Sequence, residues 1–204
     1  MGDQDATSGN PQRWKSVLAP RVENRIIQLF VDYQRKFKPL LAEVEAQQQC
    51  LPAEILNEIR AIFDHLSRCY DPVNKDDEEK VFSNLEKARN HLKRAILDCY
   101  KTSILYLHDE IERFMESINT IDMTVVNNGK FYERLLELRH HAKQAYYVAK
   151  MHESVELEHV DFDSFQSALA RYHETADHIR ENLNAIEWAK QRTVKKSFFR
   201  CCSR

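Results

Sequence analysis

Apolar residues recur at steps of three and four along most of the chain, the spacing that gathers side chains on one face of an α-helix. The first such run follows Pro20, a residue that suits the first turn of a helix. Its members are Val22, Ile26, Leu29, Tyr33, Phe37, Leu40 and Val44. Because Pro39 falls inside this run and has no backbone N–H, we expect the helix to be kinked or split near Lys38.

A second helix is expected after Leu51 and Pro52, and it ends before the turn sequence DPVNKDD at residues 71–77. Its apolar positions in register are Ile55, Ile59, Ile62, Leu66 and Cys69. Three further apolar residues lie alongside them, namely Leu56, Phe63 and Tyr70. A helix that is apolar over so wide a face is typical of a buried position. We therefore expect this helix to be central in the fold.

The third predicted helix is long and runs from about Asp77 to Ile118. Roughly forty residues at about 1.5 Å per residue span about 60 Å. Its seam comprises Val81, Leu85, Ala88, Leu92, Ala95, Cys99, Ser103, Leu107, Ile111, Phe114 and Ile118. The stretch NTIDMTVVNNGK at residues 119–130 contains β-branched residues, paired asparagines and the one internal glycine. It predicts a loop with a short strand-like segment.

Two more helices complete the pattern. The fourth carries Phe131, Leu135, Leu138, Ala142, Ala145, Ala149 and His152 at steps of three and four. The fifth, capped by Asp161 or Asp163, carries Phe162, Phe165, Leu169, Tyr172, Ala176, Ile179, Leu183 and Ile186. Steps that alternate between three and four are the heptad pattern of coiled coils.

These patterns predict an all-α fold, an elongated antiparallel bundle of about five helices with coiled-coil-like heptad seams. A compact bundle of shorter, broken helices is the alternative. Composition favours helices as well, because the chain has three glycines and its five prolines all lie in the first 72 residues, whereas β-rich domains need frequent turn residues. The predicted organisation is a flexible leader at 1–12, a single helical-bundle domain at 13–190 and a tail at 191–204.

The sequence predicts a cytoplasmic protein without a cofactor or metal. No run approaches the roughly 18 apolar residues of a membrane span, and the first residues are polar rather than signal-like. The five cysteines show no Cys-x-x-Cys spacing, which disfavours a disulfide framework and a zinc site. Two Glu-x-x-His strings, Glu137 with His140 and Glu156 with His159, have the spacing of di-iron ligands in bundles. The second lies in a predicted loop, so we predict no metal site.

One alternative function is catalytic and concerns RNA. Arg134 is followed at short spacing by His140 and His141. In the HEPN class of helical ribonucleases an Arg and a following His at this spacing meet at a dimer interface and act on RNA phosphates, so a divergent HEPN-like ribonuclease is one alternative. Leu135 departs from the polar residue that the family favours after the arginine. Two other pairs have a similar spacing, Arg60 with His65 and Arg171 with His178.

The tail differs in charge from the rest of the chain. Residues 190–204 hold six basic residues and no acidic one, while the other 189 residues carry 24 basic and 32 acidic side chains. The predicted binding residues of the tail are Lys195, Lys196, Phe198, Phe199, Arg200, Cys201 and Cys202. Basic and aromatic residues together suit an anionic membrane surface, and adjacent cysteines are candidates for lipidation. A contact with an acidic protein, or a simple helix end, explains the same residues.

The sequence therefore predicts a non-enzymatic helical interaction or scaffold protein. Its helix seams are expected to bind its own copy or another helical protein. No catalytic residue and no cofactor are predicted in this interpretation. Two alternatives remain open: a HEPN-like ribonuclease that uses Arg134, His140 and His141 on RNA, and a membrane-binding module that attaches through the basic tail to the inner membrane face.

Overall fold

The computed structural model describes residues 20–71, 77–155 and 162–201, with side chains up to 153 and 193 in the last two ranges. Within these residues the fold is all-α and contains no strand. The hairpin pairs of residues 53–118 and 130–181 pack antiparallel, and these described residues together with the rest of the described chain form six helices when the interrupted first helix is counted as one. The predicted all-α antiparallel bundle is confirmed. The heptad geometry of its seams remains a prediction.

The first helix is interrupted where the sequence predicts it. It comprises α1 (Pro20–Asp32), a π-helical turn (Tyr33–Phe37) and α2 (Lys38–Gln48). Pro39 cannot donate the hydrogen bond that its position in the helix requires, and the wider π turn immediately before α2 accommodates that loss. The disruption near Lys38 is therefore a π turn within a continuous helix.

Helix α3 (Ala53–Cys69) is followed by the longest helix, α4 (Glu78–Ile118), which has 41 residues. The Asp77 side chain caps α4 by accepting a hydrogen bond from the backbone N–H of Lys80. Both ends of α4 agree with the prediction to within one residue. Buried residues occur along its whole length, which makes α4 the central element of the fold.

The loop after α4 contains no strand-like segment, so that expectation was wrong. It consists of two short 3₁₀ turns, Met123–Val125 and Asn127–Gly129. Asn127, Asn128 and Gly129 all have positive φ angles, a conformation that asparagine and glycine adopt more readily than other residues and that cannot continue a strand.

The last predicted helix is divided in two. After α5 (Lys130–Val155), the chain forms α6 (Phe162–Glu181) and α7 (Leu183–Cys201) with a break at Asn182. The Asn182 side-chain amide donates a hydrogen bond to the carbonyl of His178 at 2.9 Å, and the Asn182 backbone N–H donates to the carbonyl of Ile179. The side chain thus takes the acceptor that a continuous helix would use.

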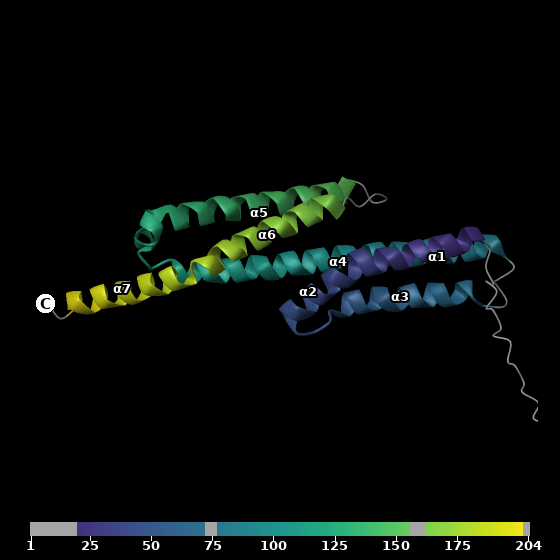
Figure 1. Ribbon diagram of the computed structural model, residues 1–204, viewed down its shortest axis with the longest axis horizontal. Coiled ribbons are helices and arrows are strands. Elements are labelled where there is room, and N and C mark those ends of the chain that lie inside the picture. The colour runs from purple at the N-terminus through teal and green to yellow at the C-terminus, as the bar shows by residue number, and fades with distance from the viewer. Residues whose placement is uncertain (1–19, 72–76, 156–161, 202–204) are drawn as a thin grey trace, which may run out of the picture.

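The helices form two halves that share α4 (Figure 1). The first half of α4 packs against α1, α2 and α3, and the second half packs against α6, which in turn packs against α5. Where the halves meet, His173 on α6 approaches Glu43 on α2 at 2.9 Å. Helix α7 continues beyond the other helices at the end opposite α1 and α3. The expectation that α3 would be central was wrong, because α3 packs mainly on α4.

Candidate protein-binding groove

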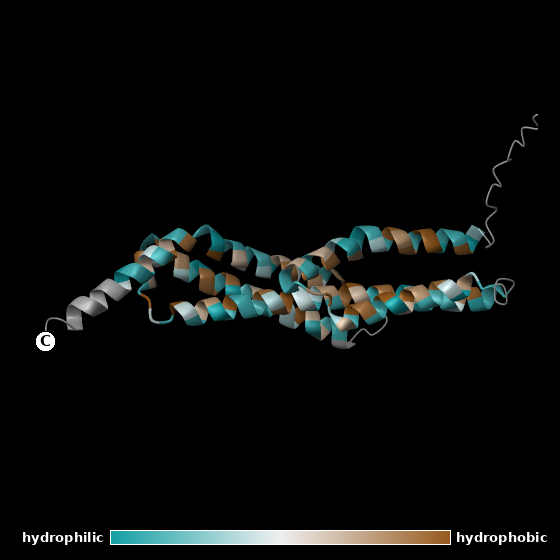
Figure 2. Ribbon diagram, turned by 90° about the horizontal axis from the view of Figure 1, so that it is seen from below, coloured by the Kyte–Doolittle hydropathy of each residue, from teal (hydrophilic) through white to brown (hydrophobic). Residues whose placement is uncertain are grey.

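An apolar groove lies between α1 and α3, with α4 as its floor. Both outer helices pack along α4 rather than along each other. In Figure 1, α3 runs beside α4, and in the view turned by 90° α1 runs apart from the other two helices (Figure 2). The groove has a volume of about 140 Å³. Its lining consists of Leu29, Phe30, Tyr33, Ile59, Ile62, Phe63, Leu66 and Leu92.

Large apolar side chains on the walls of the groove are exposed. Phe63 is 64% exposed and Phe30 is 50% exposed, while Leu92 in the floor is only 2% exposed. Ile27, Leu56 and Tyr70 extend the exposed surface along the same two helices. Contiguous apolar surface of this kind marks interaction sites on soluble proteins.

Helical spacing explains why the walls are apolar. Leu56 and Phe63 on α3 and Tyr70 directly after its end are seven residues apart. They therefore share one side, next to the face that Ile55 and Ile62 bury against α4. The sequence shows the width of this apolar face correctly. Half of it faces the groove instead of a neighbouring helix of the same chain.

The arrangement resembles a four-helix bundle that lacks one helix. In such a bundle each helix has two neighbours and buries two adjoining faces. Here α4 has α1 on one side and α3 on another, and the groove occupies the position that a fourth helix would take. The apolar walls are consistent with an occupant that is itself a helix.

Covering the groove would release a substantial free energy. Complete burial of a large apolar side chain contributes about 1.5–3 kcal/mol. Five such side chains that are each about half exposed therefore offer roughly 4–7 kcal/mol before the costs of association. These side chains could therefore form the central, energetically dominant part of a specific interface.

The rim of the groove is polar. Burial, with smaller contributions from the charges of Cys69 and Glu23, raises the pKa of the Tyr70 hydroxyl at the end of α3. Arg60 and Ser67 are exposed on α3 beside the apolar stripe. An apolar centre with a polar rim is the usual anatomy of a protein interface.

The α1 wall is the part of the site that sequence analysis missed. Ile27 and Phe30 lie outside the seam formed by Val22, Ile26 and Leu29, and the pattern gave them no role. The available signal was that α1, like α3, carries apolar residues beyond those needed for a single seam.

The predicted ribonuclease residues all lie on α5. The Arg134 guanidinium donates to Glu137 Oε2 at 2.8 Å and to Glu174 Oε1 at 3.0 Å, and the hydrogen bond to Glu137 is the main cause that raises its pKa. His140 and His141 are exposed, with ring centroids 6.0 Å apart. The carboxylates of Glu137 and Glu174 thus occupy two of the five N–H donors of Arg134.

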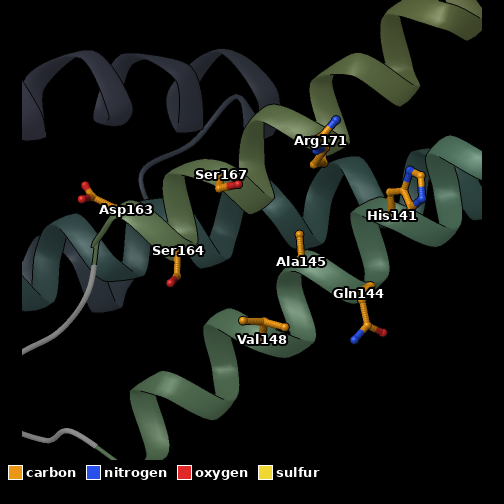
Figure 3. A pocket seen from close by; sticks show the side chains of 8 residues that line it. All are labelled: His141, Gln144, Ala145, Val148, Asp163, Ser164, Ser167 and Arg171. Carbon is orange, nitrogen blue, oxygen red and sulfur yellow. The ribbon is translucent and has the colours of Figure 1, made fainter.

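His141 also lines an open, shallow groove of about 570 Å³ between α5 and α6. Arg171 lies in the same groove, and it donates to the second carboxylate oxygen of Glu174 at 3.1 Å. Gln144 and Arg171 extend in opposite directions (Figure 3), so the polar groups do not converge on one point. The ribonuclease hypothesis remains a prediction.

The metal hypothesis concerns the two Glu-x-x-His strings. Among the described residues, no three His, Cys, Asp or Glu side chains gather as metal ligands. Glu137 pairs with Arg134, and Glu156 and His159 lie outside the described residues.

The predicted binding tail is partly described. The backbone of α7 is helical through Cys201, so positions 195–201 lie on this helix, while their side chains and Cys202 lie outside the described residues. No helix in the described part of the chain is long and apolar enough to cross a membrane. Attachment of the tail to an anionic membrane surface remains a prediction.

No protein-family model, curated protein or solved structure matches this chain. The inference about function therefore depends on the residues and geometry of the groove.

Proposed function

We propose that the protein is a non-enzymatic helical interaction protein, and that the groove between α1 and α3 receives a helix of a protein partner. The observation that carries this proposal is the exposure of Phe30 and Phe63 on the two walls of an apolar groove. A helix with an apolar stripe can bury both rings and the groove floor at once. The hydrophobic gain supplies affinity, and the polar rim supplies orientation.

Site-specific photo-crosslinking in cells tests the proposal. The photoreactive amino acid p-benzoylphenylalanine replaces Phe63 in one variant and Tyr147 in a matched control. Tyr147 is 59% exposed on α5, far from the groove. We expect irradiation to link position 63, and not position 147, to a polypeptide that mass spectrometry identifies. Equal labelling at both positions, or none at position 63, would contradict a protein-binding groove.

A further inference from the structure

The α3 helix has the features that the occupant of the groove requires. Its exposed stripe contains Leu56, Phe63 and Tyr70, and the partly buried Ile59 and buried Leu66 lie between them. The steps are three, four, three and four, which is the pattern of a helix that packs in a coiled coil. One helix therefore forms a wall of the groove and also presents the apolar surface that fits such a groove.

We propose that the occupant is a second copy of this chain, docked so that α3 of each copy fills the groove of the other. This inference rests on the proposed function and names its partner. A two-fold axis parallel to the helices, placed beside the two α3 helices, generates the arrangement. This axis places α3 of each copy in the groove of the other copy. Because the two contacts are equivalent, the assembly closes as a dimer.

The arrangement of helices within each copy is unchanged in this dimer. Each α4 keeps α1 and α3 as neighbours, and each groove gains one helix. The two α3 helices run parallel, so equivalent residues meet across the axis, with Phe63 near the middle of the stripe and Leu56 and Tyr70 seven residues to either side. Parallel pairing along such a stripe is the arrangement of two-stranded coiled coils.

The size of the surface supports a dimer. A stable interface buries about 800 Å² on each partner, and a large aromatic side chain buries about 150–250 Å². The five exposed side chains on α1 and α3, each about half exposed, supply roughly half of that area, and the dimer requires the rest from polar neighbours along about 14 residues of α3. The groove of about 140 Å³ is close to the volume of about 150 Å³ that holds a benzene ring in an apolar cavity, so it can accept an aromatic side chain of the partner.

Light scattering coupled to size-exclusion chromatography on the full chain tests self-association. We expect twice the 24.2 kDa monomer mass at micromolar concentration. Phe63→Glu should raise the dissociation constant roughly 30- to 1,000-fold, because it places two carboxylates together at the centre of an apolar seam. Tyr147→Glu is the matched control and should leave the constant unchanged. Circular dichroism should show the same helicity in all three proteins, because both substituted side chains are exposed in the single chain.

Spin labels on Cys50 test the orientation. Cys50 is exposed and precedes α3 by three residues, whereas Cys69 and Cys99 are buried; Cys201→Ser and Cys202→Ser remove the two remaining thiols. In the parallel dimer the two labels lie at the same end of the α3 pair and should give a short distance. In an antiparallel dimer centred on Phe63 they would lie about 40 Å apart along the axis.

The possible results separate this inference from the proposed function. A dimer that survives Phe63→Glu, or a long distance between the labels, overturns the inference. A protein that stays monomeric at about 100 μM, and whose position 63 crosslinks to another protein, overturns the dimer but supports the proposed function. A monomer whose position 63 crosslinks to residues 1–19 of its own chain contradicts both. A monomer with no crosslink at position 63 contradicts both.

Discussion

At the scale of single residues, Glu112 connects α4 to α5. Its carboxylate accepts hydrogen bonds from Arg139 Nε at 2.8 Å and Arg139 Nη2 at 2.5 Å, and Lys143 Nζ lies 3.0 Å away. The paired hydrogen bonds from Arg139, with a further contribution from Lys143, lower the pKa of Glu112 to about 2. Bidentate pairs of this kind are among the stronger polar contacts in proteins.

We predict that Glu112→Gln lowers the free energy of unfolding at pH 7 by roughly 1–2 kcal/mol, a value reduced for solvent screening because the pair lies near the surface. The pKa of Glu112 is lower in the folded state than in the unfolded state. The stabilisation is therefore complete above pH 4.5 and is lost as the pH falls toward about 2. Urea denaturation of both proteins across this range measures the difference.

The neighbouring Glu110 is the control for this prediction. It is exposed on α4, and its nearest cation, Arg113, lies 3.8 Å away. Glu110→Gln should change stability by less than about 0.5 kcal/mol. A Glu112→Gln effect that stays constant between pH 7 and pH 2 would show that the ion pair does not cause it.

At the scale of elements, the sequence predicted the bounds of α4 and an interruption of the first helix near Lys38, because these depend on local spacing, capping and proline chemistry. It did not predict the groove. An apolar stripe shows which face of a helix avoids water, and the stripe on α3 was correctly located. Whether another helix covers that stripe depends on where α1 lies on α4, and this placement is set by contacts that are distant in sequence.

The short connection between α4 and α5 gives a prediction at the same scale. Gly129 has a φ of 82°, and the nearest heavy atom to an added Cβ would be 4.0 Å away at Thr124. Gly129→Ala should therefore cost about 1–2 kcal/mol through backbone strain rather than through a steric clash. Thermal unfolding measures this cost. Asn128→Gly, at a φ of 55°, is the control and should be nearly neutral; equal effects of the two changes would argue against strain.

At the scale of the whole molecule, the shared helix α4 predicts cooperative unfolding. Leu85 is buried in the first half and Trp188 lies on α7 beyond the second half. We expect Leu85→Ala to cost about 2–4 kcal/mol and to shift the Trp188 fluorescence transition as much as the loss of helicity. Trp14→Phe leaves Trp188 as the single tryptophan. Phe63→Glu, introduced into the Leu85→Ala protein and into its parent, prevents self-association from affecting either transition. A Trp188 transition that Leu85→Ala leaves in place would mean that the halves unfold independently.

The length of α4 has a consequence for how many ligands the protein can hold at once. The part of α4 from Leu92 in the groove floor to Ile118 at its end spans about 40 Å, so a ligand in the groove leaves α7 accessible. In a parallel dimer, both α7 helices would emerge from the same pole. A surface that binds one of them would meet the second at high effective concentration, and two weak attachments would then combine through avidity.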